Sequence, residues 1–262
     1  MISTKEKYPK AVTAFGFSKG AVMGVLQRFL EKIRERTVEN SASCDGCGRE
    51  VFSYPTPRLC EKCLERITLN DGYYCQKCGR PTRMDGVCKS CKRALPEFEK
   101  GASALAYFDF SAGLVNQFKN GKRYLVYYFA EEVCKVLPRL PQRDYTLVAV
   151  PLTRKKKRLR GYNQSVELVK RLAALTGFPH RIDLLEKVRD NEQKQLSAIE
   201  RRRSIVGLFR VTDRKFCKGK DFLVVDDIMT SGATLSEIAS RLLRAGASSV
   251  CVITVSAVPD RD

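Results

Sequence analysis

The sequence predicts an α/β fold, with a mostly parallel sheet flanked by helices and a small cysteine-rich module before it. Three observations support this prediction. After residue 100, short apolar runs alternate with stretches of helical periodicity; before it, eight of the eleven cysteines fall in four Cys-x-x-Cys pairs. With 262 residues, 44% of them apolar and 29% charged, the chain can form one substantial domain and a small one. This composition excludes a disordered chain, a fibrous repeat and a multi-span membrane protein.

Residues 1–43 read as a basic leader. From Val22 to Ile33 apolar residues recur at helical spacing, so we expect an amphipathic helix that packs on the domain. A membrane-surface or partner helix is the alternative. No stretch reaches the roughly 18 uncharged apolar residues that a spanning helix needs, and paired cysteines in an odd total suit reduced metal ligands. We therefore expect a cytoplasmic protein, with peripheral contact at the inner face of the membrane left open.

The segment 44–95 is a predicted zinc-binding module, because it contains four Cys-x-x-Cys pairs and too few apolar runs for a core of its own. Two thiolates separated by two residues can bind one tetrahedral zinc from a tight turn, and two such turns complete a site. We expect two structural zinc ions. One zinc with a degenerate second site and redox dithiols are the alternatives, and which pairs share a metal stays open. The predicted ligands are Cys44, Cys47, Cys60, Cys63, Cys75, Cys78, Cys88 and Cys91.

The segment 100–258 is the predicted α/β domain. Such strand–helix alternation predicts parallel strands joined by crossover helices that cover both faces of the sheet. Gly246 follows the last helix, where a left-handed glycine commonly ends one. The expected strands are 104–108, 146–150, 222–226 and 250–255, and the expected helices are 123–136, 162–175 and 234–245.

The most informative stretch begins in the third expected strand, which ends in Asp226 and Asp227. A loop of small and hydroxyl residues follows and leads into a helix. Such a loop presents backbone N–H groups and hydroxyls to one phosphate, at a helix N-terminus whose dipole favours anions. The two carboxylates suit the vicinal hydroxyls of a ribose, directly or near Mg²⁺. A sugar with a 5-phosphate satisfies both halves, and the loop residues are Thr230, Ser231, Gly232, Ala233 and Thr234.

The order strand–Asp–Asp–x–x–Thr–Ser–Gly–x–Thr resembles the phosphoribosyl pyrophosphate (PRPP) motif of type I phosphoribosyltransferases. Residues 44–258 as a whole resemble the ComF family (ComFC-like competence proteins), whose members carry an N-terminal zinc module and a phosphoribosyltransferase-like domain. The segments that carry this resemblance are Phe118–Arg123, Arg160–Gln164 and Arg189–Phe209. The chain departs from the family pattern at Asn120, Asp190 and Ser204, and its cysteine pairs are twice those of some members.

The resemblance implies a type I phosphoribosyltransferase-like fold that binds PRPP with Mg²⁺. Asp226 and Asp227 are then the catalytic pair, and residues 230–234 hold the 5-phosphate. The implied reaction displaces pyrophosphate at the anomeric carbon, under a loop that closes and excludes water. The residues expected on pyrophosphate or in this loop are Thr153, Arg154, Lys155, Lys156 and Arg189. Asn163 and Gln164 offer amides to a base or ribose, with helix capping as the alternative.

The charge balance favours a polyanionic partner, because 48 Lys and Arg against 29 Asp and Glu give +19 at pH 7. The basic run 154–160 can serve pyrophosphate or nucleic acid, or can be a solvated loop. The ComF resemblance implies a role in single-stranded DNA uptake during natural transformation, with a competence helicase or membrane uptake machinery as partner. We expect a PRPP-binding phosphoribosyltransferase-like protein with an unidentified acceptor. A non-catalytic PRPP or nucleotide sensor that binds DNA and a nucleobase salvage enzyme are the alternatives.

Overall fold

The computed structural model describes residues 42–51, 59–188 and 205–260. The chain from Ser43 onward forms one compact unit. The expected leader helix lies within residues 1–41, outside the described residues, and stays a prediction. Among the described helices, none is both long and apolar enough to cross a membrane.

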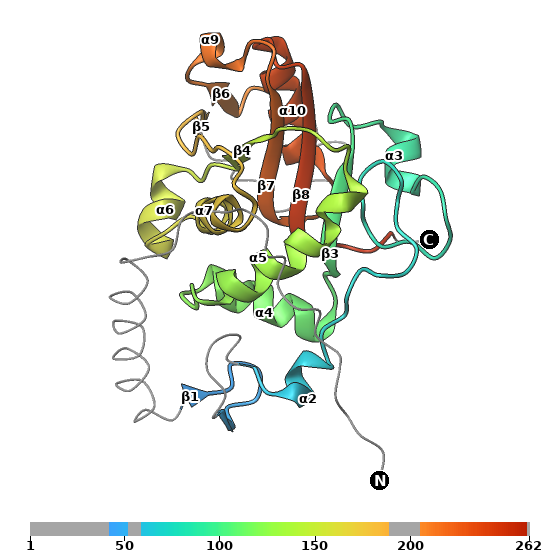
Figure 1. The fold of residues 1–262 in the computed structure, drawn as a ribbon, viewed down its shortest axis with the longest axis vertical. Coiled ribbons are helices and arrows are strands. Elements are labelled where there is room, and N and C mark those ends of the chain that lie inside the picture. Colours follow the sequence, from blue (N-terminus) through green and yellow to red (C-terminus); the bar gives the residue numbers. More distant parts are fainter. Residues whose placement is uncertain (1–41, 52–58, 189–204, 261–262) are drawn as a thin grey trace, which may run out of the picture. The chain divides into compact units, whose positions relative to one another are not determined.

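A four-stranded parallel sheet with the order β3-β8-β7-β4 forms the centre of this unit (Figure 1). All three neighbouring pairs are parallel, which confirms the predicted α/β class. The central strands are almost wholly buried, as expected for a sheet covered on both faces. The strands are β3 (Gly101–Ala106), β4 (Thr146–Ala149), β7 (Asp221–Met229) and β8 (Ser249–Ala257).

Helices cover both faces of the sheet because the strand residues alternate between two cores. Leu223 and Val225 of β7 pack in one core with α4 (Asp109–Lys119), α5 (Leu125–Val136) and α7 (Gln164–Thr176). Phe222 and Val224 pack in the other core, with the apolar face of α10 (Ala233–Arg244). The period-two alternation of β7 thus meets helices on each side. The three predicted helices are present, and α4 is an additional helix that the sequence reading did not predict.

Strand β7 continues three residues beyond the expected end at Asp226. Its pairing with β8 persists through Ile228 opposite Ser256 and Met229 opposite Ala257. The predicted carboxylates therefore lie within the strand, and the loop begins only at Thr230. The remaining elements near this end are the antiparallel pair β5 (Leu185–Lys187) and β6 (Phe209–Val211), the 3-10 helix η1 (Leu137–Arg139), α6 (Arg154–Arg160) and α9 (Arg214–Cys217).

The cysteine-rich segment contains little regular structure and packs against the α/β sheet through both of its halves. Cys44 and Cys63 belong to the core of α4 and α5, whereas Cys75 and Cys88 belong to the core of α10. Asn70 lies in the chain between the two halves and connects the second half to strand β3. Its side-chain amide donates to the Gly79 carbonyl at 2.8 Å and to the Ser103 carbonyl of β3 at 3.0 Å. The elements are β1 (Ala42–Ser43), β2 (Glu50–Val51), α2 (Glu61–Leu64) and α3 (Lys89–Arg93).

Candidate functional site

Two adjacent carboxylates lie near the carboxyl end of the central strand β7. Asp227 is buried, with 6% of its surface exposed, and Asp226 is half-buried. The Ser165 hydroxyl donates to Asp226 Oδ1 at 2.9 Å, and the backbone N–H of Asp227 donates to the same oxygen at 2.9 Å. Lys119 Nζ lies 3.4 Å from Asp227 Oδ1. Three elements, α4, α7 and β7, thus fix the orientation of this pair.

Burial raises the pKa of both carboxyl groups. For Asp226, burial and the neighbouring charge of Asp227 raise the pKa to about 7, although Ser165 opposes the shift. For Asp227, burial raises the pKa, and the attraction of Lys119 opposes it. Two crowded carboxylates with one nearby ammonium group favour a further positive charge or hydroxyl donors. An oxygen-only donor set of this kind suits Mg²⁺, which prefers carboxylate and water ligands.

The predicted phosphate loop connects β7 to α10. Gly232 has a φ of 76° and directly precedes the helix, and its carbonyl accepts the first-turn N–H of Ser236 at 2.9 Å. A Cβ at Gly232 would meet only the Met229 side chain, at 3.7 Å or more, so the loop is open at this position. Because α10 has 12 residues, its N-terminus carries the partial positive charge of an aligned helix dipole. The loop thus has the local geometry of an anion site.

All the predicted loop residues lie together at the β7–α10 junction. Thr230 is exposed, and its carbonyl accepts a hydrogen bond from the guanidinium of Arg80 at 2.8 Å. Ser231, Gly232 and Thr234 are half-buried. Ala233 is buried as the first residue of α10, and its N–H donates to Ser231 Oγ at 3.4 Å. The carboxylates and this loop are separated by only two strand residues, so one ligand can reach both.

The sequence reading assigned no role to two residues that contact the carboxylates, Lys119 and Ser165. Lys119 is the last residue of α4 and belongs to the segment 118–123. This segment is one of those that carry the family resemblance, which could have indicated a role for Lys119. Ser165 lies in the first turn of α7 and carries no motif of its own. It meets Asp226 only because α7 packs on β7, a contact across 61 residues of sequence.

Side chains of the segment 160–164 form hydrogen bonds to the backbone at the end of α4, at the end of β4 and at the start of α7. Asn163 caps α7 by accepting the Ser165 N–H at 3.0 Å, and it donates to the Val150 carbonyl at 3.0 Å. Gln164 donates to the carbonyl of Lys119 at 3.2 Å, and the Tyr162 hydroxyl donates to the carbonyl of Phe118. These bonds support the capping alternative for Asn163, whereas Gln164 and Tyr162 bind the end of α4 that carries Lys119.

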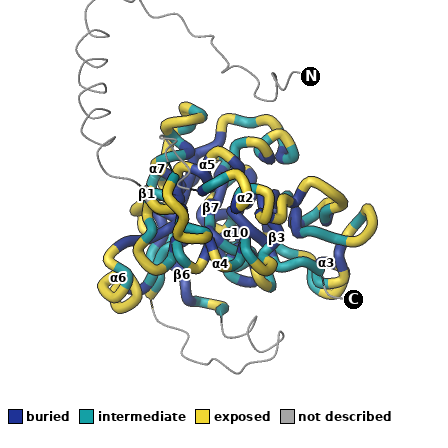
Figure 2. The backbone as a smooth tube through the Cα atoms, turned by 90° about the horizontal axis from the view of Figure 1, so that it is seen from below, coloured by how far each residue is buried: buried dark blue, intermediate teal, exposed yellow. Residues whose placement is uncertain are grey.

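The basic run after β4 is a short helix, α6, rather than the loop that the sequence suggested. Thr153 is buried and caps this helix, with its side chain accepting the Lys156 N–H at 3.4 Å. Arg154 and Lys155 are exposed in the first turn. The tube of α6 is exposed over most of its length (Figure 2). The preceding Val150 bonds to the Val225 carbonyl at 3.1 Å, so the run begins at the sheet edge that holds the carboxylates. Arg189 lies outside the described residues.

The eight paired cysteines form two groups that could each hold a metal ion. In each group the four sulfur atoms lie within 4.8 Å of one another. A tetrahedral zinc with bonds of about 2.3 Å requires sulfurs about 3.8 Å apart. The distances from Cys47 to Cys60, 3.7 Å, and from Cys78 to Cys88, 3.8 Å, fit this requirement. Adjacent pairs share a site, which settles the pairing: Cys44, Cys47, Cys60 and Cys63 form the first group, and Cys75, Cys78, Cys88 and Cys91 the second.

The two groups differ in exposure. In the first group Cys47 is exposed and Cys60 half-buried, whereas all four cysteines of the second group are buried. Backbone N–H groups point at the sulfurs, as from Cys88 to Cys75 Sγ at 3.2 Å. Arg80 Nε also donates to Cys78 Sγ at 3.4 Å. The second group is therefore enclosed by the protein, and one of its sulfurs contacts a cation.

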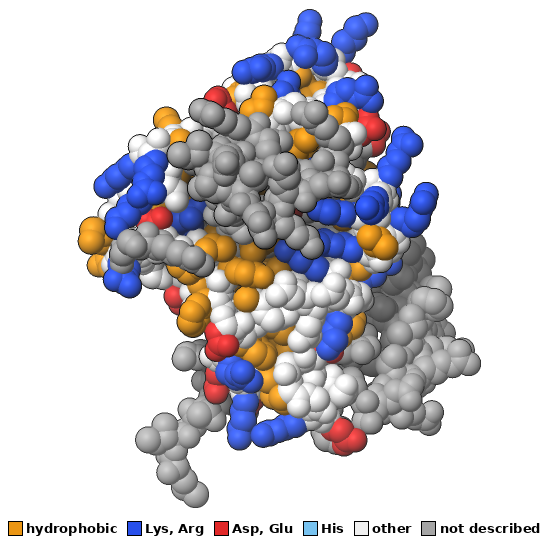
Figure 3. All heavy atoms as spheres, turned by 180° about the vertical axis from the view of Figure 1, so that it is seen from behind, with side chains coloured by type: hydrophobic (Ala, Val, Ile, Leu, Met, Phe, Trp, Pro, Cys, Tyr) orange, Lys and Arg blue, Asp and Glu red, His pale blue; other side chains and the backbone are white. Residues whose placement is uncertain are grey.

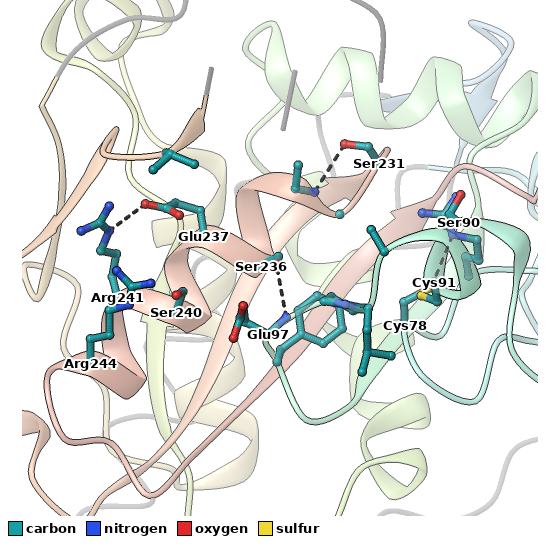
Figure 4. A pocket seen from close by; sticks show the side chains of 18 residues that line it. Cys78, Ser90, Cys91, Glu97, Ser231, Ser236, Glu237, Ser240, Arg241 and Arg244 are labelled. Carbon is teal, nitrogen blue, oxygen red and sulfur yellow. Dashed lines mark hydrogen bonds and ion pairs between the residues drawn. The ribbon is translucent and has the colours of Figure 1, made fainter. Parts of the chain in front are cut away.

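A cavity of about 260 Å³ lies between the second cysteine group and α10 (Figure 4). Cys78 and Cys91 border it on one side, and Ser231, Ser236 and Ser240 on the other. Ser236 Oγ accepts the N–H of Glu97 at 3.0 Å, which fastens the linker after α3 to α10. The cavity thus runs along α10 from the phosphate loop, beside the contact of Arg80 with that loop.

Comparison with known proteins places this site in a wider context. Residues 159–262 match the family model described as phosphoribosyl transferase domain. Competence protein ComFC of Bacillus subtilis (strain 168) is 26% identical over 210 residues, 77% of this chain and 85% of that protein. DNA utilization protein YhgH of Salmonella typhi is 31% identical over 210 residues, which cover 74% of this chain and 88% of that protein. Competence protein F of Haemophilus influenzae is 26% identical over 216 residues, which cover 79% of this chain and 86% of that protein.

Proposed function

Since the chain belongs to the ComF family of phosphoribosyltransferase-like proteins, we propose that it binds PRPP with Mg²⁺ and transfers phosphoribose with release of pyrophosphate. The observation that carries the proposal is the junction of β7 and α10. There, the oriented carboxylates Asp226 and Asp227 lie two strand residues before an open anion loop. A ribose 5-phosphate presents both vicinal hydroxyls and a phosphate, so it suits both parts of this junction.

Each part of the site has a distinct task in this proposal. The N–H groups and hydroxyls of residues 230–234 bind the 5-phosphate. Asp226 and Asp227 bind the ribose hydroxyls, with Lys119 holding Asp227 in place. Mg²⁺, when bound, supplies positive charge for the hydroxyls and the departing pyrophosphate. Thr153, Arg154, Lys155 and Lys156 serve the pyrophosphate from the neighbouring strand end.

The proposed reaction breaks the bond between the anomeric carbon and the pyrophosphate oxygen, whose electron pair leaves with pyrophosphate. A nitrogen nucleophile forms the new bond to that carbon and then loses its proton. The departing pyrophosphate or solvent accepts this proton, so Asp226 stays bound to the ribose hydroxyls. Preorganised cations beside the pyrophosphate stabilise the negative charge that develops on it in the transition state.

The test measures PRPP binding by calorimetry and pyrophosphate release in Mg²⁺, with nucleobases, amines and single-stranded DNA as acceptors. The double variant Asp226→Asn, Asp227→Asn should lose PRPP binding and keep its zinc content. Asp221→Asn is the matched control, because Asp221 lies at the opposite end of the same strand, where its side chain accepts a hydrogen bond from Ser249 at 2.6 Å. Unaltered PRPP affinity in the double variant would contradict the site assignment.

We also propose that the protein handles single-stranded DNA, as a partner of a DNA-uptake helicase or membrane machinery. The names of the relatives, a competence protein and a DNA utilization protein, support this role. The net charge of +19 and the exposed cations of α6 support a polyanionic partner. Lys and Arg side chains spread over much of the face in Figure 3, with scattered acidic ones between them.

If PRPP binds but no acceptor supports pyrophosphate release, a PRPP sensor that binds DNA becomes the better assignment. Fluorescence anisotropy with a labelled oligothymidylate, with and without PRPP, tests the DNA role. Lys157→Glu with Arg158→Glu should weaken binding by at least tenfold and reduce its salt dependence. Lys215→Glu with Lys218→Glu changes the net charge equally at exposed positions of another element and should weaken binding less. Equal losses would point to net charge alone.

A further inference from the structure

Arg80 is a buried cation that joins the second cysteine group to the phosphate loop. Only 5% of its surface is exposed. Its Nε donates to Cys78 Sγ at 3.4 Å, and its terminal nitrogen donates to the Thr230 carbonyl at 2.8 Å. The two residues of the latter bond are 150 positions apart in the chain. One side chain therefore contacts both a predicted metal ligand and the first residue of the loop.

The charge of a zinc site explains why an arginine can be buried here. Burying an unpaired guanidinium costs several kcal/mol, so it needs an anionic neighbour. Four thiolates around one Zn²⁺ carry a formal charge of about −2, which supplies that neighbour. The backbone of Arg80 is fixed in the same turn, because its carbonyl accepts the Cys75 N–H at 2.9 Å. Both the position and the burial of Arg80 thus depend on the second group.

The bond to Thr230 orients a phosphate donor. In a trans peptide the carbonyl and the following N–H point in opposite directions. When Arg80 holds the Thr230 carbonyl, the N–H of Ser231 lies in the same peptide plane and points in the opposite direction, away from Arg80. Ser231 N–H is among the donors proposed for the 5-phosphate. A rotation of this peptide would turn that donor away and present a carbonyl oxygen in its place, which repels an anion.

We propose that Arg80 is a positioning residue that couples the metal in the second cysteine group to the phosphate loop. This proposal deepens the proposed function and rests on it. With the metal bound, Arg80 holds Thr230 and the loop is preformed for the phosphate of PRPP. Loss of the metal frees the turn that carries Arg80, and the loop loses this support. PRPP affinity therefore depends on the second metal.

The first cysteine group serves as an internal comparison, because among the described residues it contacts α4 and does not contact the phosphate loop. Asp45, between Cys44 and Cys47, accepts from Lys122 Nζ at 2.9 Å, just after α4. A Cβ on Gly46 would meet the Phe110 ring of α4 at 2.6 Å. The first group thus packs on α4, on the face of the sheet opposite α10. Removing its metal leaves the bond between Arg80 and Thr230 in place, so PRPP affinity should fall much less than after removal of the second metal.

The first experiment compares PRPP affinity in Arg80→Met and Arg139→Met, both zinc-loaded and in excess Mg²⁺. Arg139 is the matched control, because it too donates to a carbonyl of the cysteine-rich segment, Asn70 at 2.7 Å. We expect Arg80→Met to raise the dissociation constant at least about fivefold, the usual lower end of coupling between sites, and Arg139→Met to leave it unchanged. Equal dissociation constants for Arg80→Met and the unaltered protein would overturn the coupling.

The second experiment needs no substitution at Arg80, so it decides the matter if Arg80→Met does not fold. If the metal strengthens PRPP binding, PRPP must strengthen metal binding by the same factor. In equilibrium competition with a colorimetric chelator, one of two zinc equivalents should therefore need a higher chelator concentration for its removal when PRPP is added. The double variant Asp226→Asn, Asp227→Asn should show no such shift. If PRPP binds yet shifts neither equivalent, the coupling is wrong and the proposed function stands; if PRPP does not bind, both are wrong.

Discussion

Two glycines, one in each cysteine group, give a sharp test of how the second group is joined to the sheet. Gly48 and Gly79 both follow the second cysteine of a pair and have φ values of 76° and 73°. Around Gly48 an added Cβ meets nothing within 4 Å, whereas at Gly79 it would lie 2.4 Å from the Gly101 carbonyl oxygen of β3. Substitution by alanine therefore imposes the same backbone strain at both sites but a steric clash at only one.

The expected difference follows from these distances. An L residue in the left-handed region costs about 1–2 kcal/mol, which is the whole effect expected for Gly48→Ala. At Gly79, β3 and the cysteine turn must also separate by about 0.6 Å or more, which is overpacking worth about 1–3 kcal/mol. The separation strains the bonds from Gly101 N–H to the Lys77 carbonyl, 2.8 Å, and from Asn70 to the Gly79 carbonyl, 2.8 Å. Gly79→Ala should therefore destabilise by about 2–5 kcal/mol.

Thermal unfolding of the zinc-loaded variants measures this difference. For a chain of this size about 1 kcal/mol lowers Tm by roughly 2–4 °C, so the additional cost of about 1–3 kcal/mol should make Gly79→Ala unfold roughly 2–12 °C below Gly48→Ala. Zinc content by mass spectrometry should fall only for Gly79→Ala. Equal Tm values for the two variants would refute the docking of the second group on β3 as a source of stability.

Further expectations concern charge, metal and capping. Because the pKa of Asp226 is raised to about 7 in the folded state, the folded protein keeps the carboxyl proton at pH values where the unfolded chain has lost it. The protonated carboxyl therefore contributes stability that is full below about pH 4 and is lost as the pH rises to about 7. Asp226→Asn should therefore weaken the pH dependence of the free energy of unfolding, measured by denaturant titrations at several pH values. The PRPP affinity of the unaltered protein should rise several-fold from about pH 6 to 8, and an affinity that does not change with pH would contradict the pKa shift. Cys47→Ser should lose one zinc equivalent with little loss of PRPP affinity, and Cys88→Ser should lose one equivalent together with PRPP affinity, as metal analysis and calorimetry would show. Asn163→Ala should destabilise by about 1–3 kcal/mol through loss of the α7 cap and the bond to Val150, and no change in Tm would rule out that role.

The sequence by itself determined the features that are local in the chain. Each Cys-x-x-Cys pair is a single turn, so spacing alone predicts its ligands. The stretch from Asp226 to Thr234 is one strand, loop and helix start, so its pattern predicts a ribose-phosphate site without knowledge of the rest of the fold. Strand–helix alternation likewise predicts the parallel sheet, because crossover helices are what join parallel strands.

Only the tertiary structure decided which distant residues meet at these features. The packing of α7 and α4 on the sheet brings Ser165 and Lys119 to the carboxylates. Packing decided that adjacent cysteine pairs share a site and that Arg80 reaches Thr230. Such contacts depend on burial and on the register of strands far apart in sequence, and no local pattern encodes them. Short motifs therefore predict which residues bind the ligand and the metals, while tertiary packing decides which other residues position them.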